Sequence, residues 1–217
     1  MKRIFLFLIF FISQFLIFST AFAAGKDSAT RKVLDATAQR INNAGPLSIQ
    51  FTATTIIGKA SQGSISGTMD IMGRKFYMKT PEVQTWFDGK TQWTIQTGDS
   101  EVSMTEPTGA ELQMINPYAF INIYKKGFNY RMKQGTLSNK KQGYKITLTA
   151  DNSKQEIREM FLEVDKQYNP VRISIRQGKN QWVRLVVNRF STGQKFDTQH
   201  FTFPKKRYPK HEIIDLR

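Results

Sequence analysis

The chain contains no cysteine and only two histidines, His200 and His211, among its 217 residues. The missing thiols exclude disulfide bonds, thiolate metal ligands, thiol catalysis and lipid attachment at a cysteine. The two histidines lie near the C-terminus at no metal-ligand spacing, and no cluster of carboxylates accompanies them. We therefore expect no metal site and no cofactor.

Two short segments come close to known catalytic motifs but lack a required residue. Ile65 occupies the serine position of residues 63–67, which otherwise fit a nucleophile elbow. Residues 89–91 read Gly-Lys-Thr, yet Gln84 stands where a P-loop needs its first glycine. Acidic residues are scattered, so their spacing neither supports nor excludes a carboxylate pair of the glycosidase type. We expect a protein that is not an enzyme.

Long apolar runs are restricted to the start of the chain. Lys2 and Arg3 precede an almost continuous apolar stretch at 4–18, and Ala21-Phe22-Ala23 follows it. This order is typical of a secretory signal peptide at 1–23. No later stretch approaches the length of a membrane-spanning helix. We therefore expect residues 24–217 to form a single exported domain in the periplasm, without an anchor.

Acidic residues are also few, because 17 Asp and Glu oppose 32 Lys and Arg, a net charge of +15. Cleavage after residue 23 removes Lys2 and Arg3 and leaves +13. Nucleic acid is the usual partner of such a charge, but export argues against it, and the basic residues are dispersed. Two interpretations stay open: solvated outer faces of strands, or attraction to anionic lipid head groups or an acidic partner.

The pattern of apolar residues predicts two short helical regions. Residues 27–43 form an amphipathic segment that Asp27 or Ser28 can cap, and Gly45-Pro46 ends it. A second region begins with a capping box at 108–111 and restarts at Asn116-Pro117. Gly127 is its expected end.

Most of the remaining chain alternates apolar and polar residues with a period of two. The pattern predicts about eleven or twelve strands at the spacing of a meandering all-β fold, with a short last strand at 201–203. Asp88-Gly89 is the strongest turn signal. As a two-residue turn it places Trp86 opposite Thr91. Trp86, Trp93 and Ile95 then share one face of the sheet, with Phe87 on the other.

The composition is rich in large apolar side chains. After the signal peptide the chain keeps 10 Phe, 7 Tyr, 3 Trp and 7 Met. Methionine beside aromatic residues suits a surface that accepts variable apolar ligands, although an ordinary core has the same composition. A wide, open sheet with few helices can leave an apolar cavity on its concave face.

Several segments together resemble LolA-type periplasmic lipoprotein carriers, most of all those of the Bacteroidetes branch. Their most specific part is the hairpin Thr-Trp-Phe-Asp-Gly-Lys-Thr-Gln-Trp at 85–93. Gly-Ser-Ile-Ser-Gly-Thr-Met-Asp at 63–70, Lys75-Phe76 and Pro81-Glu82 precede it, Asn116-Pro117 follows, and Phe-Thr-Phe-Pro at 201–204 comes before a short tail. The resemblance spans nearly the whole exported chain.

The resemblance implies a mainly β fold, a half-open antiparallel barrel of about eleven strands covered by a few short helices. It implies a monomeric carrier that takes lipoproteins from an inner-membrane ABC-type transporter to an acceptor at the outer membrane. It also suggests Arg74 as a latch for the helical lid. The residues expected to line the acyl cavity point inward from strands and helices: Phe51, Ile65, Met69, Phe76, Met78, Trp86, Trp93, Ile95, Met104, Leu112, Ile115, Phe120, Ile121, Tyr124, Ile146 and Leu148.

Two other functions remain as alternatives at this stage. The first is a binding module for another lipid or amphiphile, or a lipoprotein sensor in signalling, because related families of the same fold bind other lipids. The second is an enzyme that acts on envelope polymers. Native mass spectrometry of the protein purified from its own periplasm would separate these hypotheses. Bound lipid or lipoprotein would favour a carrier or binding module, and a chain without ligand would favour an enzyme.

Overall fold

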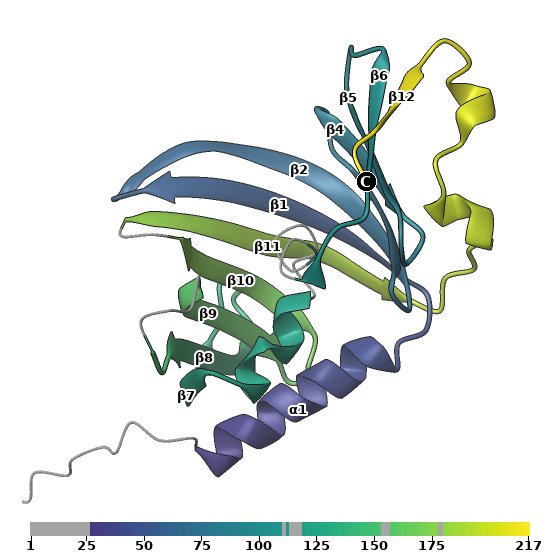
Figure 1. Ribbon diagram of the computed structural model, residues 1–217. Coiled ribbons are helices and arrows are strands. Elements are labelled where there is room, and N and C mark those ends of the chain that lie inside the picture. Colours follow the sequence, from purple (N-terminus) through teal and green to yellow (C-terminus); the bar gives the residue numbers. More distant parts are fainter. Residues whose placement is uncertain (1–26, 110–111, 113–118, 153–156, 178–179) are drawn as a thin grey trace, which may run out of the picture.

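One twelve-stranded sheet dominates the computed structural model, which describes residues 27–109, 112, 119–152, 157–177 and 180–217 (Figure 1). The expected signal peptide and Ile115 lie outside the described residues. The elements in chain order are α1 (Ser28–Asn42), β1 (Leu47–Ile57), β2 (Ala60–Met72), β3 (Lys75–Lys79), β4 (Val83–Phe87), β5 (Gln92–Gln96), β6 (Glu101–Thr105), η1 (Ala119–Lys125), β7 (Phe128–Thr136), β8 (Gln142–Ala150), β9 (Ile157–Asp165), β10 (Pro170–Gln177), β11 (Gln181–Thr192), η2 (Thr198–Phe201), η3 (Lys205–Arg207) and β12 (Glu212–Asp215).

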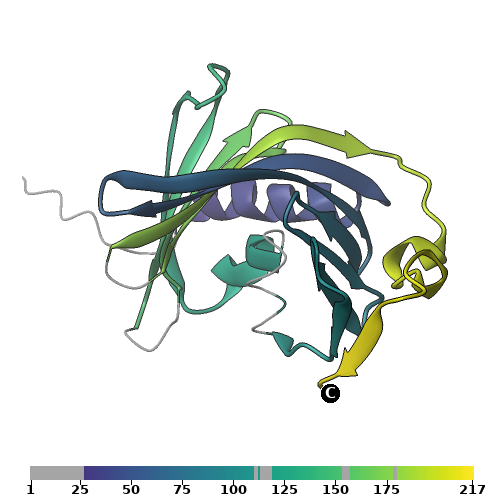
Figure 2. The same ribbon diagram turned by 90° about the horizontal axis from the view of Figure 1, so that it is seen from above.

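The sheet is an incompletely closed barrel. Its strand order is β12-β6-β5-β4-β3-β2-β1-β11-β10-β9-β8-β7, so β12 and β7 form two separate edges. All neighbouring strands are antiparallel except β12 and β6. Figure 2 shows the sheet curling around α1 and η1, which lie on its concave side. The predicted half-open, mainly β fold is confirmed, with β12 added to the eleven strands expected.

The strand register separates the side chains into two faces. Ile49 pairs with Met69, and Met69 pairs with Met78. Because paired residues of neighbouring strands point to the same side, these three lie on one face. It is the face that α1 covers, since Ile49 and Met69 share the main hydrophobic cluster with residues of the helix. We call it the inner face. The prediction that Phe76 and Met78 share a face with Ile65 and Met69 is confirmed.

Helix α1 begins where the sequence predicts. The Asp27 side chain accepts a hydrogen bond from the backbone N–H of Ala29 at 3.0 Å and caps the helix. Val33, Leu34 and Ile41 are buried against the inner face of the sheet. Across the described residues, no helix is both long and apolar enough to span a membrane.

The hairpin between β4 and β5 has a longer turn than the sequence predicts. Trp86 pairs with Trp93, not with Thr91, and the turn spans residues 88–91. The carboxylate of Asp88 accepts hydrogen bonds from the backbone N–H groups of Lys90 and Thr91 at 2.9 and 2.8 Å, which stabilises this wider turn. The pairing of β4 with β5 is shifted by two residues from the predicted pairing. Because side chains alternate with a period of two, each one keeps the predicted face relative to its neighbours.

The C-terminal segment 196–215 covers the outer face of strands β3–β6, and we call it the strap. It contains η2, η3 and β12, and it was expected to include a strand at 201–203. Instead Phe201 and Phe203 insert their rings into the protein and are 0% and 6% exposed. Figure 1 shows the strap rising from the end of β11 along the outside of β4–β6 before β12 turns back and joins the sheet. The strap therefore buries residues of the outer face such as Trp86, Ile95 and Val102.

Candidate functional site

The apolar inner face continues beyond the residues that α1 covers. Met78 on β3, Ala53 on β1 and Val187 on β11 lie on this face. They pack against the main hydrophobic cluster but are only partly buried. Ile65 pairs with Ala53 and is also partly buried. We call these four residues the inner apolar patch. Their partial exposure leaves apolar surface that the described residues do not fully bury.

A glycine shapes the floor of this region. Gly67 on β2 pairs with Phe51 on β1. A Cβ atom at position 67 would lie 2.7 Å from Cζ of Phe51 and 2.7 Å from the carbonyl oxygen of Lys79. The Phe51 ring therefore lies directly over the glycine, and a side chain there would force it toward the patch.

A polar link fastens η1 to α1 on the same side of the sheet. The hydroxyl group of Tyr124 donates a hydrogen bond to the carboxylate of Asp35, and the Arg31 guanidinium also binds Asp35, at 2.9 Å. Arg31 lies 5.5 Å from the centre of the Tyr124 ring. Burial and the bond to Asp35 raise the pKa of Tyr124, whereas the Tyr124 and Arg31 hydrogen bonds lower the pKa of Asp35. The link keeps the hydroxyl protonated and the carboxylate ionised.

Apart from Ile115, Phe120 and Ile121, the expected cavity residues divide into three groups. Ile65, Met78 and Leu112 are partly buried, and the first two belong to the inner apolar patch. Phe120 and Ile121 fall in η1, but the structure does not describe their side chains. The residues at most 5% exposed belong to the packed core of the inner side and present little surface to a ligand: Phe51, Met69, Phe76, Tyr124, Ile146 and Leu148.

The third group faces the opposite side of the sheet, so its expected place in the cavity is wrong. Trp86, Trp93 and Ile95 do share a face, as predicted, but it is the outer one. Met104 pairs with Trp93 and lies there too. Trp86 and Ile95 are buried under Phe203 of the strap in a second hydrophobic cluster. Alternation fixes which residues share a face but not which face is concave.

Arg74 lies in the turn between β2 and β3 and is exposed. Among the described residues, no ion pair connects it to a carboxylate. Its role as a lid latch stays a prediction. The Tyr124–Asp35 bond joins η1 to α1, and no motif in the sequence marked it, because 89 positions separate the two residues.

The described residues contain no group of three or more metal-ligating side chains. His200 instead binds the Asp70 carboxylate at 2.7 Å and stacks on Phe196, which fastens the strap to β2. A hollow of about 610 Å³ lies on the outer face, lined by side chains of β1, β2, β9, β10 and β11. No sequence pattern marked this hollow, because its residues alternate with core residues and meet only through the strand pairing.

The sequence matches one protein family over most of its length. The family described as "Outer membrane lipoprotein carrier protein LolA" matches residues 19–179. Among curated proteins, no relative matches the chain.

Solved structures with a similar arrangement have very different sequences. A LolA superfamily protein of Nitrosomonas europaea is 9% identical, with a TM-score of 0.46, over 79% of this chain and 96% of its own. The lipoprotein LppX of Mycobacterium tuberculosis is 15% identical, with a TM-score of 0.45, over 77% and 99%. LprF of Mycobacterium bovis is 9% identical, with a TM-score of 0.46, over 80% and 98%.

Proposed function

Because this chain belongs to the LolA family of outer membrane lipoprotein carrier proteins, we propose that it binds the acyl chains of lipoproteins and carries them through the periplasm. In this proposal residues 1–23 direct export and are removed. The donor is an inner-membrane ABC-type transporter, and the acceptor lies at the outer membrane. The protein acts as a monomer and catalyses no reaction.

The observation that carries the proposal is the half-buried state of the inner apolar patch. A carrier must offer apolar surface and still release its ligand, and each buried CH₂ group contributes about 0.8 kcal/mol to binding. A fully packed inner face would offer no site, whereas a wide dry cavity would hold acyl chains too tightly. Met78 beside buried Met69 and Ile49 extends the core outward as a flexible apolar surface.

The position of η1 supports the same function. It lies on the concave side of the sheet with α1, and Tyr124 fixes one part of it to Asp35. A short helix can move as a unit at a lower energetic cost than the strands of the sheet. We infer that η1 moves when acyl chains enter and so opens the concave side of the sheet.

The test replaces Met78 with aspartate and measures both the melting temperature and the transfer of a diacyl lipopeptide to vesicles. We expect a near-native melt, since the carboxylate can reach water, and loss of transfer, since the apolar surface is interrupted. Met72→Asp is the matched control, because Met72 is half-buried on the outer face of β2 beside Lys75. It should keep transfer.

Two other outcomes would count against the proposal. A melting temperature lowered by tens of degrees in Met78→Asp would assign Met78 to the core. A milder Met78→Ser variant would then decide whether transfer depends on this face. Intact transfer in a stable Met78→Asp protein would falsify the acyl site on β3.

A further inference from the structure

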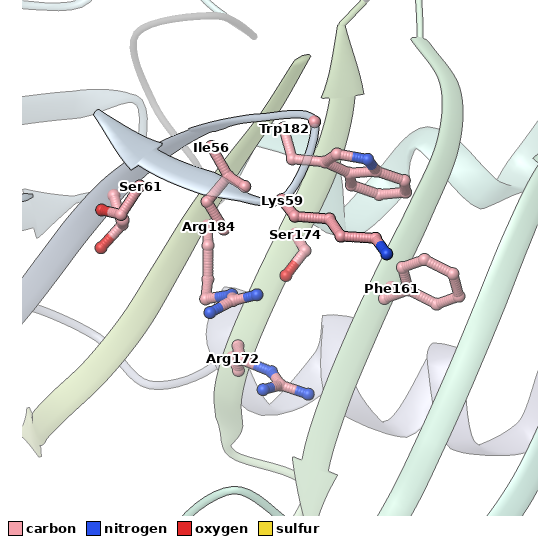
Figure 3. A pocket seen from close by; sticks show the side chains of 10 residues that line it. Ile56, Lys59, Ser61, Phe161, Arg172, Ser174, Trp182 and Arg184 are labelled. Atoms are coloured by element: carbon pink, nitrogen blue, oxygen red, sulfur yellow. The ribbon is translucent and has the colours of Figure 1, made fainter. Parts of the chain in front are cut away.

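The hollow on the outer face combines cations with exposed apolar side chains. Lys59, Arg172 and Arg184 line it together with Phe161 and Trp182, and hydroxyl groups of Thr54, Ser61 and Ser174 complete its wall. Figure 3 shows the guanidinium groups of Arg172 and Arg184 directed to the same side of the sheet, with the Lys59 chain extended toward Phe161. Its volume of about 610 Å³ is within the range of small-molecule sites.

The strand register builds this hollow from successive cross-strand pairs. Ser174 pairs with Phe161 on one side and with Arg184 on the other, and Arg184 pairs with Thr54. In the next row Trp182 pairs with Ile56. The hollow is therefore on the face opposite to the inner apolar patch, and a ligand there would not compete with acyl chains inside the barrel.

Two of the three cations keep their charge available. Arg172 binds the carboxylate of Glu163 at 2.7 Å, and Glu163 also accepts hydrogen bonds from the backbone and hydroxyl groups of Ser138. In the part of the chain that the structure describes, no ion pair joins Lys59 or Arg184 to a carboxylate. The hollow thus carries a net positive charge.

The apolar part of the site is unusually exposed. Among the described residues only three large apolar side chains are exposed, and one of them, Phe161, lines this hollow and is 38% exposed. The Phe161 ring stacks on Trp182 with centroids 5.3 Å apart and planes at 23°, across the intervening strand β10. Fixed aromatic rings beside cations are typical of protein surfaces at the membrane–water boundary.

The turn that carries Lys59 and Ile57 is held in place. The backbone N–H of Gly58 donates a hydrogen bond to the carbonyl oxygen of Asn180 at 2.8 Å, which joins the β1–β2 turn to the loop between β10 and β11. Gly58 adopts a φ of 63°, which suits glycine. The β1–β2 turn that carries Lys59 is therefore fastened beside the start of β11, where Trp182 lies.

We propose that this hollow docks the protein onto membranes rich in anionic phospholipids, with a phosphate head group between Lys59 and Arg184. Phe161 and Trp182 then enter the boundary between head groups and acyl chains. A dissolved anion would need the cations but not the exposed apolar side chains, and so the surface fits a lipid better than free phosphate. The net charge of the exported chain, +13 after removal of Lys2 and Arg3 with residues 1–23, strengthens the attraction to such a membrane. The inference goes beyond the proposed function, because it concerns contact with a membrane and not the ligand held inside.

The test measures binding of the purified protein to vesicles of phosphatidylcholine, with and without phosphatidylglycerol. We expect binding only to the anionic vesicles, and about 30-fold weaker binding for the Lys59→Gln/Arg184→Gln variant. This factor corresponds to about 1 kcal/mol for each cation near an anionic surface, with tenfold equal to about 1.4 kcal/mol. Lys205→Gln/Lys206→Gln is the control, since both lysines are exposed on η3 of the strap, and it should lose much less.

Further measurements separate the alternatives. Phe161→Ser removes an exposed side chain, so it should fold normally and still weaken vesicle binding several-fold. Inorganic phosphate should not displace the vesicles more strongly than sodium chloride of equal ionic strength. Strong competition by phosphate with full binding by Phe161→Ser would replace the membrane with a free anion. Equal losses of binding in Lys59→Gln/Arg184→Gln and Lys205→Gln/Lys206→Gln would reduce the effect to overall charge. Lipopeptide binding in solution should be unchanged in all variants, which keeps this result independent of the inner site.

Discussion

The hydroxyl group of Tyr124 on η1 donates a hydrogen bond to the carboxylate of Asp35 on α1, across 89 positions of the sequence. Tyr124 is 1% exposed, and its ring also packs edge-on against Tyr130 of β7. One side chain thus joins the helix that covers the sheet, the short helix on its concave side and an edge strand. The bond is charge-assisted, and such bonds are about twice as strong as neutral ones.

We expect Tyr124→Phe to lower the free energy of unfolding by about 1.5–3 kcal/mol, the usual contribution of a hydrogen bond to a charged group. The ring and its packing remain, so the loss reports the bond alone. Arg31 still pairs with Asp35, which favours the lower end of this range. Chemical denaturation of the two proteins measures the difference. An unchanged stability would show that the bond contributes nothing to the fold.

The same residue predicts a dependence on alkaline pH. The pKa of Tyr124 is raised in the folded protein, so the unfolded chain loses this proton first as pH rises. The stability that the protonated hydroxyl provides is complete below pH about 10 and is lost as pH rises above that value. Melting temperatures between pH 8 and 11 should fall more steeply for the natural protein than for Tyr124→Phe. Parallel curves would contradict the assignment.

Gly67 predicts a steric effect at the floor of the inner apolar patch. In Gly67→Ala the new methyl group meets the Phe51 ring and the backbone oxygen of Lys79, both 2.7 Å away. The ring can turn but the backbone can only shift, and so we expect a loss of about 1–3 kcal/mol in the free energy of unfolding. Gly135→Ala is the control, because no atom lies within 4 Å of its Cβ position. Equal melting temperatures for the two variants would contradict the close packing.

The position of Trp86 predicts that its fluorescence reports on the strap and not on the inner apolar patch. Its ring lies edge-on to Phe203 of the strap at 5.4 Å and is 4% exposed on the outer face. In a variant that keeps only this tryptophan, a diacyl lipopeptide should leave the emission nearly unchanged. Phe203→Ala should shift it to longer wavelength, because removing the ring admits water. A large shift with the lipopeptide alone would show that the strap moves when ligand binds.

Much of the fold follows from the alternation of side chains, but the placement of the site does not. Period-two patterns predicted the strands and placed Phe76 and Met78 on one face with Ile65. They could not predict that the strap buries the Trp86 face, because residues 196–211 have no regular period. Thr85, Trp86 and Phe87 are buried in succession. Neighbouring residues of a strand point to opposite faces. The adjacent large apolar residues Trp86 and Phe87 were therefore the one feature of the sequence that indicated coverage of both faces of β4.

Glu163 predicts an effect on the stability of the fold and an opposite effect on membrane binding. It is 4% exposed and joins Arg172 on β10 to Ser138 beyond the end of β7. Glu163→Gln keeps the shape and one acceptor but removes the charge. We expect the free energy of unfolding to fall by about 1–3 kcal/mol, since the Arg172 guanidinium loses its ionic partner while still partly in water.

The same substitution should strengthen binding to anionic vesicles about fivefold, because it releases one positive charge at the outer hollow and each such charge contributes about 1 kcal/mol. Measuring both properties on one preparation separates the two consequences. A protein that is merely damaged would bind less well or aggregate, and thus weaker binding would show that the ion pair serves only the fold. Unchanged binding with lowered stability would place Arg172 outside the contact with the membrane. Stronger binding by a less stable protein is the combination that the geometry of Glu163, Arg172 and the hollow requires.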